Sequence, residues 1–386
     1  MEKTKFGLFY DKYYIALLLI PVVLVIASLF YLGNFYSVNG DFIYKDISLA
    51  GGTTVTISEK SVLNDLDLSE SLLKAAIPDV GFKRLSDLST NTDLALVVES
   101  SLDPDVLKPL VEDALGIVLT SDNSSTEFNG PSISSSFYSE LLKVILLSFI
   151  LMGLVVFIIF GESKFVKSLC VFLSLSAVRL TFPASGFLFG FVILIGAAAI
   201  IYSLINIRKE KNINKIFFGL SALLFLSSLF YPLYFMVFVS LLLLLIIYSI
   251  NSGPSIAVVF AAFSNLVFVT VVVDLMGVKL SSAGLVAFLM IIGYSVDTDI
   301  LLTNRVLRSR EGTVNHRIKG AFNTGLFMTI TALASVLPAF LLVTGLPDSF
   351  RQIFLVISIG LFADIINTWL TNAGIIKLYC KRKGIN

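Results

Sequence analysis

Two carboxylates, Asp297 and Asp299, lie inside an apolar run that is long enough to cross a bilayer. The run covers residues 282–302, and a membrane-spanning helix needs about 20 residues. A carboxylate near the centre of such a helix costs about 2.5–3.5 kcal/mol on insertion scales. A chain keeps that cost where the group faces a bundle interior or a water-filled path, so the pattern predicts a proton or charge relay. The alternative is an early helix end, with both carboxylates at the cytoplasmic interface beside Arg305 and Arg308.

The composition is that of a membrane protein. Of the 386 residues, 56% are hydrophobic and 14% are charged, and the mean hydropathy is +0.91. A net charge of +1 leaves no basic stripe to neutralise phosphates, which argues against nucleic acid as a partner. The two cysteines, Cys170 and Cys380, predict neither a disulfide framework nor a metal site. We expect no cofactor.

The Lys and Arg clusters predict the topology. Placing every cluster in the cytoplasm gives about ten spans with both termini inside. The expected spans are residues 14–32, 141–160, 168–182, 186–207, 217–230, 234–250, 255–275, 282–302, 320–344 and 350–378. An uncharged turn at Tyr231-Pro232-Leu233 separates two of them. The predicted localisation is the cell membrane, with a multi-pass chain.

These spans divide the chain into five parts. They are a first transmembrane helix (1–33), an external α+β domain (34–139), a second transmembrane helix (140–161), inserted transmembrane hairpins (162–252) and four last transmembrane helices (253–386). In the external domain, Gly51 and Gly52 predict a turn that leads into a β-branched strand. A second strand is expected at 93–99, with helices at 69–77 and 104–114, the latter opened by Pro104.

The final span carries a polar stripe. Asp364, Asn367, Thr368 and Thr371 follow the spacing i, i+3, i+4, i+7 and share one helix face. In lipid such a stripe must turn inward to find partners. Asp364 in particular needs a partner or a proton.

Two further patterns bear on that interior. Thr324, Thr331 and Ser335 share a face of the preceding span; they either line the interior or bond back to their own helix. Asp297 and Asp299 are two residues apart, so they point to nearly opposite sides and cannot form a dyad within one helix. Spacing leaves open which of them meets the last span.

Four motifs resemble the SecD/SecF family of protein-export membrane proteins, in its archaeal SecF form. Residues 293–303 (GYSVDTDILLT) resemble the motif of the family's fourth helix, and residues 363–374 (ADIINTWLTNAG) resemble its last helix. Residues 48–53 (SLAGGT) resemble the start of its external domain, and residues 128–132 (FNGPS) its entry into the second helix. The resemblance covers residues 1–160 and 253–386.

This resemblance implies the fold class: an α-helical polytopic membrane protein with a six-helix core, related to the resistance-nodulation-division (RND) transporters. About four inserted helices and a small external ferredoxin-like α+β domain complete it. The implied function is that of a non-enzymatic accessory subunit of the Sec export machinery, linked to the proton gradient. The implied partners are SecD, the Sec translocon channel, unfolded secretory proteins and the lipid bilayer.

The resemblance and the polar pattern together select candidate residues. The candidates for proton relay are Asp297, Asp299, Asp364, Asn265, Tyr294, Ser295, Asn367 and Thr368. The expected structural positions are Gly51, Gly52, Gly130, Pro131 and Gly293. No residue is expected to bind a metal.

The chain departs from the family pattern in three places. The inserted hairpins have no counterpart in the six-helix core. Asn265 stands where the family usually has an Asp, and Thr298 stands where bacterial relatives have an acidic residue. The alternative function is an independent RND-type, proton-driven exporter of small molecules or lipids. Exporters of that type carry two six-helix repeats. Since this chain has one six-helix core, we expect a partner protein to supply the second.

Overall fold

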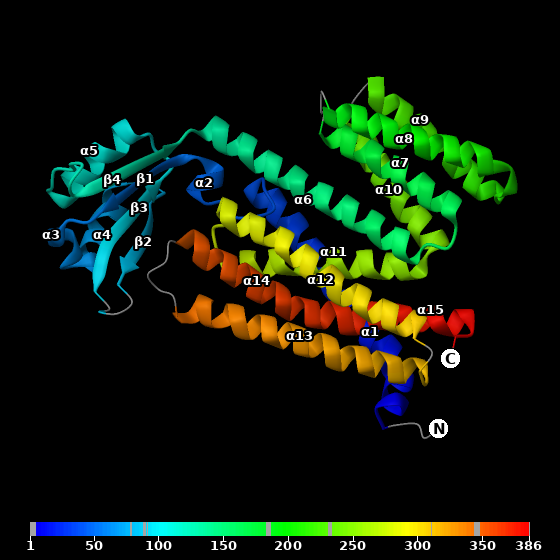
Figure 1. Ribbon diagram of the computed structural model, residues 1–386. Coiled ribbons are helices and arrows are strands. Elements are labelled where there is room, and N and C mark those ends of the chain that lie inside the picture. The colour runs from blue at the N-terminus through cyan, green and yellow to red at the C-terminus, as the bar shows by residue number, and fades with distance from the viewer. Residues whose placement is uncertain are drawn as a thin grey trace.

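The computed structural model is mainly helical, with one small sheet at one end of a long bundle (Figure 1). It describes residues 5–77, 79–87, 90, 92–182, 187–230, 234–309, 311–342 and 348–385. The expected turn at Tyr231-Pro232-Leu233 therefore lies outside the described residues.

Six long helical segments form the core of the bundle. They are α1 (Lys5–Asn39), α6 (Pro131–Phe160), α11 (Gly253–Leu275), α12 (Ser282–Arg308), α13 (Val314–Leu342), and α14 (Asp348–Ile366) continued by α15 (Ala373–Lys383). A π-helical segment, Asn367–Asn372, joins α14 to α15 without a break. The six-helix core and its fold class agree with the sequence-based prediction.

Four helices lie between α6 and α11 as a separate lobe. They are α7 (Lys164–Thr181), α8 (Phe187–Asn206), α9 (Asn212–Phe230) and α10 (Tyr234–Asn251), with a 3₁₀ turn at Ile207–Lys209. The first of them is central, because α7 packs against α6 and against each of the other three. Phe172, Leu173 and Cys170 of α7 are fully buried in this lobe's core.

Eight helices in the described part of the chain are long and apolar enough to cross a membrane. A ninth, Phe235–Asn251, is apolar but shorter. A helix of the described chain lies in each of the ten expected spans, and the number that crosses the membrane stays a prediction. Helix α7 is not among the candidates, and Lys164, Lys167 and Arg179 explain why, since three charges in 18 residues lower its suitability as an independent span.

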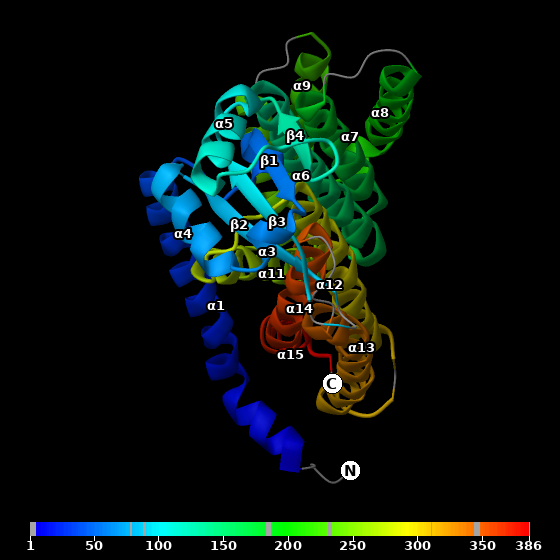
Figure 2. The ribbon, with the colours of Figure 1, turned by 90° about the vertical axis from the view of Figure 1, so that its left-hand side faces the viewer.

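The α/β domain has the β-α-β-β-α-β order of a ferredoxin-like fold, as predicted. Its strands are β1 (Gly52–Ile57), β2 (Gly81–Ser86), β3 (Asp93–Ser100) and β4 (Ser124–Asn129), in the antiparallel order β2-β3-β1-β4. Its helices are α2 (Ile47–Ala50), α3 (Lys60–Leu63), α4 (Leu66–Ala76) and α5 (Pro104–Leu115). Figure 2 views the molecule from the side of this domain.

The domain core explains why these segments form strands and helices. Val55 and Ile57 alternate along β1 and meet Leu96 and Val98 of β3, and Leu73 of α4 packs on the same side of the sheet. Period-two burial along a strand places every second side chain on one face. The helices cover that face, so the domain has its own core.

Several element boundaries differ from the prediction. Helix α1 continues to Asn39, and α6 already begins at Pro131 rather than near residue 140. Helix α4 begins at Leu66 because Asp65 accepts a hydrogen bond from the Leu68 amide at its start. The strands β2 and β4 were not anticipated, since their sequences GFKRLS and SSTEFN lack a clear apolar alternation.

Gly51 and Gly52 lie where a side chain does not fit. Their φ angles are +88° and +140°, values that L-residues with side chains rarely adopt. A Cβ on Gly51 would lie 2.6 Å from the Pro131 Cα, and one on Gly52 would overlap the carbonyl oxygen of Ser100. This geometry supports the proposal that both glycines are structural.

Replacing Gly52 by Ala is expected to lower the free energy of unfolding of the α/β domain by about 1–3 kcal/mol through backbone strain, with the steric overlap adding to that. Pulse proteolysis of the full chain in increasing urea, with cleavage followed in this domain, measures the change. Gly116→Ala is the matched control, since Gly116 has φ +64° and no atom lies within 4 Å of the place that a Cβ would take. Equal effects of the two variants would contradict the steric argument.

Candidate functional site

Helices α12 and α14 run in the same direction, pack along each other and carry two buried carboxylates (Figure 1). Helix α12 begins after Ser281, whose hydroxyl accepts a hydrogen bond from the Gly284 amide. It continues through Asp297 and Asp299 to Arg308. Neither carboxylate therefore lies at an early helix end.

Asp364 is bound by threonine hydroxyls from both helices. Thr298 Oγ1 of α12 donates to Asp364 Oδ2 at 2.9 Å, and Thr368 Oγ1 donates to Asp364 Oδ1 at 3.1 Å. The two hydroxyl oxygens are 3.4 Å apart. Asp364 is 1% exposed, so these hydroxyls take the place of water around it.

The Thr298 hydroxyl lies near two acceptor oxygens but has one proton to donate. It also lies 2.9 Å from the carbonyl oxygen of Ser295, one turn earlier in α12. A threonine hydroxyl has a single proton and can donate one full hydrogen bond at a time. Ionised Asp364 and the Ser295 carbonyl therefore compete for it.

Asp299 is held by an amide instead. Asn372 Nδ2 donates to Asp299 Oδ1 at 2.8 Å and also lies 3.2 Å from the Asp299 carbonyl oxygen. Thr303 Oγ1 is 3.4 Å from the same nitrogen. Within the described residues, Asp299 Oδ2 has no hydrogen-bond partner, and neither Asp299 nor Asp364 forms an ion pair.

The π-helical segment explains how Asn372 reaches this site. Asn372 is eight residues after Asp364, outside the i, i+3, i+4, i+7 stripe. A π turn carries an additional residue, which shifts the side chains that follow it around the helix axis. Thr368, Thr371 and Asn372 are all fully buried as a result. Sequence reasoning missed Thr298, Thr303 and Asn372 as members of the site.

Asp297 lies on the opposite side of α12 from Asp299. Its side chain is exposed, as are those of Val286 and Met290 on the same helix, and Gly293 is exposed too. These four positions are spaced by three or four residues and form one face. Among the described residues Gly293 has no neighbour within 4 Å of a Cβ position, so their packing does not require a glycine there.

Asn265, Tyr294 and Ser295 lie beside the carboxylate network. Asn265 of α11 is fully buried, and neither atom of its amide has a partner among the described residues. With Tyr294 it lines a cavity of about 260 Å³ between α11, α12, α13 and α14. Ser295 is also buried. Asn367 instead lines a small cavity together with Ser28 of α1 and Ser264 of α11.

The remaining candidates have structural positions or turn away from the site. Pro131 is the first residue of α6, where a proline needs no amide proton, and Gly130 precedes it with an ordinary φ of −60°. On α13, Thr331 and Ser335 are exposed and donate to carbonyl oxygens of their own helix. Thr324 does the same and also accepts from Arg305. All three residues thus bond back to their own helix, and Ser335 also lines the cavity of Asn265 and Tyr294.

The described residues contain no group of three or more His, Cys, Asp or Glu side chains that could hold a metal ion. What the carboxylate network can do chemically is bind and release protons. Its acceptors outnumber its donors, and its two acids lie on adjoining helices.

Residues 206–382 match the family model described as protein export membrane protein SecD/SecF, C-terminal. The match begins at Asn206, inside the segment predicted as an insert, and includes α11, α12 and α14 with their polar network.

Named relatives are archaeal SecF proteins. The chain is 46% identical over 132 residues to SecF of Methanolacinia petrolearia, an alignment that covers 34% of this chain and 46% of that one. It is 48% identical over 129 residues to SecF of Methanothermobacter thermautotrophicus, with coverage of 33% and 45%. With SecF of Methanocaldococcus jannaschii the identity is 41% over 145 residues, with coverage of 37% and 51%. The chain thus spans about half the length of the relatives it matches.

A solved structure of SecDF from Thermus thermophilus, described as a translocon-associated membrane protein, aligns with a TM-score of 0.49 and 15% identity. The alignment covers 97% of this chain and 38% of that one. Residues 206–382 are thus similar to the C-terminal part of SecD/SecF proteins, and the relatives that the chain matches are SecF proteins.

Proposed function

We propose that this chain is an accessory subunit of the Sec protein-export machinery and that proton binding at Asp364 and Asp299 couples it to the proton gradient. Its partners would be SecD, the Sec channel and unfolded polypeptides in transit. The observation that carries the proposal is the pair of buried carboxylates on two contacting helices, inside the region that matches the family model.

Burial favours the protonated form of these acids. A buried carboxylate without a cation is unfavourable when charged, and two nearby carboxylates disfavour each other's ionisation. A proton on Asp364 would let Asp364 donate to Thr298 while Thr298 donates to the Ser295 carbonyl. Losing that proton restores the competition for the Thr298 hydroxyl. Each protonation event therefore changes the bonding between α12 and α14.

The exposed face of α12 supports a membrane-embedded partner. Asp297 is costly when it faces lipid, and the neighbouring Gly293 lets another helix approach closely. SecD is the partner that the family suggests. We propose that the face formed by Val286, Met290, Gly293 and Asp297 contacts SecD.

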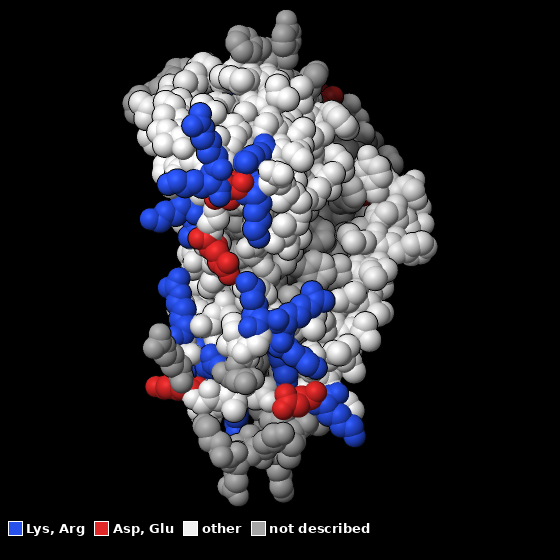
Figure 3. Space-filling model, turned by 90° about the vertical axis from the view of Figure 1, so that its right-hand side faces the viewer, with Lys and Arg blue, Asp and Glu red and all other residues white. Residues whose placement is uncertain are grey.

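The charge distribution supports an orientation. The end of the molecule opposite the α/β domain carries Lys and Arg side chains in two groups (Figure 3). The start of α1 and the end of α15 lie at that end (Figure 1). Because positive charge is concentrated on the cytoplasmic side of membrane proteins, we propose that both termini are cytoplasmic and that the α/β domain is external.

Asp364→Asn and Asp299→Asn are each expected to reduce secretion to the level of cells that lack the chain, while the amount of protein in the membrane stays unchanged. The physical reason is that Asn keeps the shape but cannot exchange a proton. Secretion of a reporter and membrane abundance are measured in the same cells.

A purely structural role predicts a different result, because a neutral amide in place of a buried charge is often tolerated or stabilising. Asn265→Asp is a useful companion, since it restores the acid found at that position in the family without touching the two carboxylates. Full secretion by both Asn variants would end the proton-coupling proposal.

Affinity purification of the intact chain is expected to recover SecD and channel subunits, and Asp297→Asn or Gly293→Leu to lower the recovery of SecD. Gly33→Leu on α1 is the matched control, because Gly33 also has no neighbour within 4 Å of its Cβ position. Recovery of neither SecD nor channel subunits by the parent chain would favour the independent exporter instead.

In a background without Cys170 and Cys380, a membrane-impermeant maleimide is expected to label Val118→Cys in intact cells and Glu311→Cys only after permeabilisation. Both positions are exposed, so failure to react reports the side of the membrane rather than burial. Labelling of Glu311→Cys from outside would reverse the proposed orientation.

A further inference from the structure

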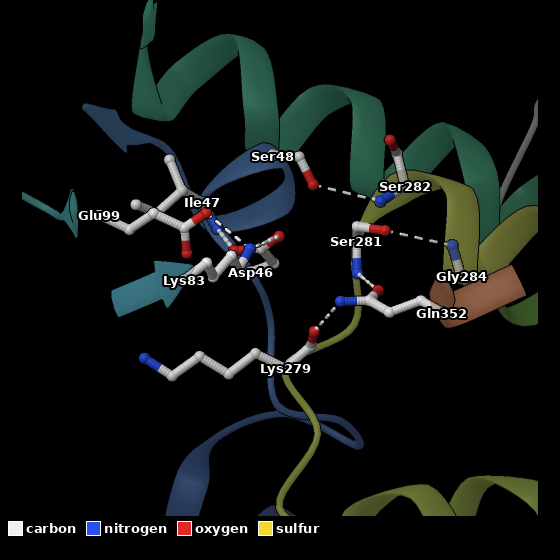
Figure 4. Close-up of polar contacts among 10 residues, drawn as sticks. All are labelled: Asp46, Ile47, Ser48, Lys83, Glu99, Lys279, Ser281, Ser282, Gly284 and Gln352. Carbon is white, nitrogen blue, oxygen red and sulfur yellow. Dashed lines mark hydrogen bonds and ion pairs between the residues drawn. The ribbon is translucent and has the colours of Figure 1, made fainter. Parts of the chain in front are cut away.

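The loop between α11 and α12 pairs with the segment that leads into the α/β domain (Figure 4). The Leu280 amide donates to the Tyr44 carbonyl at 2.7 Å, and the Asp46 amide donates to the Leu280 carbonyl at 2.9 Å. The Ser282 amide donates to Ser48 Oγ at 3.2 Å. This short parallel pairing joins the domain to the first residue of α12.

Gln352 of α14 holds the same loop from the other side. Its Nε2 donates to the Lys279 carbonyl at 2.9 Å, and its Oε1 accepts from the Ser281 amide at 2.8 Å (Figure 4). Gln352 is 8% exposed and Ser281 is 1% exposed. Both functional groups of one amide are therefore committed to two backbone groups that flank Leu280.

The pairing is also tied to the sheet. Asp46 accepts from the Ile47 amide at 2.7 Å and forms an ion pair with Lys83 of β2 at 3.4 Å. Lys83 in turn pairs with Glu99 of β3 at 2.6 Å. Burial, and then the nearby Asp46 carboxylate, raise the pKa of Glu99, while Lys83 opposes the rise. Asp46 thus contacts the loop through its backbone and the sheet through its side chain.

Polar side chains consequently connect α12 with α14 and its π-helical extension near the start of α12 and again at Thr298 and Asp299. Gln352 joins α14 to the loop before α12, Asp364 meets Thr298 farther along, and Asn372 meets Asp299 beyond that. Only the first of these contacts also reaches the α/β domain. Any sliding of α14 along α12 must break the Gln352 contacts or move the loop together with Asp46.

We infer that Gln352 is a positioning residue, through which a displacement between α12 and α14 moves the α/β domain. The inference rests on the proposed function for the cause of the displacement, namely protonation at Asp364. The joint itself consists of Gln352, the segment from Lys279 to Ser282, and the segment from Tyr44 to Ser48. Its role is mechanical, and Gln352 does not touch the carboxylates.

The test measures a distance between the domain and α12 in the full-length chain. Spin labels are placed at Val118→Cys and Met290→Cys, two exposed positions, in nanodiscs and in a background with Cys170→Ala and Cys380→Ala. Asp364→Asn serves as a fixed mimic of the protonated acid. Pulsed dipolar spectroscopy then compares Asp364→Asn with the parent, with and without Gln352→Leu.

The expected result is that Asp364→Asn shifts the distance in the parent and that Gln352→Leu removes the shift and broadens the distribution. Asn251→Leu is the matched control, since within the described residues the Asn251 amide donates to the Ile247 carbonyl of its own helix, and it should leave the shift intact. Gln352→Glu is a milder second variant, because it keeps the acceptor for Ser281 and loses the donor to Lys279.

The inference fails if Asp364→Asn causes no shift in the parent, or if the shift survives Gln352→Leu and Gln352→Glu. Secretion is assayed separately for the same variants. Normal secretion by Asp364→Asn together with a Gln352-dependent distance shift would contradict the proposed function but support the role of Gln352. Lost secretion by Asp364→Asn, together with a distance shift that persists in the Gln352 variants, would support the proposed function and contradict the role of Gln352.

Discussion

The hydrogen bond between Thr298 and Asp364 is the contact on which this architecture depends. A carboxylate at this depth has no bulk water, so its neighbours must supply either donors or a proton. Two threonine hydroxyls supply the donors, and one of them belongs to the neighbouring helix. The spacing of α12 and α14, and with it the position of the loop that precedes α12, follows from that requirement. An apolar contact would tolerate a small displacement of one helix along the other. A hydrogen bond depends on distance and angle, so the same displacement would break it.

Much of the architecture is predictable from the sequence because it depends on local patterns. The run from residue 282 begins a helix that the structure also starts at Ser282. The β-branched residues after Gly52 form β1, and the strand expected at 93–99 is β3 with one residue more. The inward stripe that begins at Asp364 is buried throughout. In each case a period of 2 or 3.6 residues sets the pattern.

The parts that escaped prediction depend on contacts distant in sequence. Asn372 reaches the site because of a π turn, and the spacing of apolar residues in the sequence does not predict such a turn. Strand β4 exists because β1 offers it a backbone partner, although its own residues are Ser, Thr, Glu, Phe and Asn. Gln352 is one of several polar residues at the start of α14, and its partners lie some seventy residues earlier. Thr324 and Thr331 of α13 have the correct spacing for an interior face, yet both are exposed.

Helix α7 has a consequence for how the chain enters the bilayer. Its side chains are covered by α6, α8, α9 and α10, and it carries Lys164, Lys167 and Arg179 within 18 residues. A segment with three charges partitions poorly into lipid by itself. We therefore expect α7 to be stable in the bilayer only together with the helices that shield it. The order of synthesis then matters for this lobe, whose central helix precedes three of the four helices that enclose it.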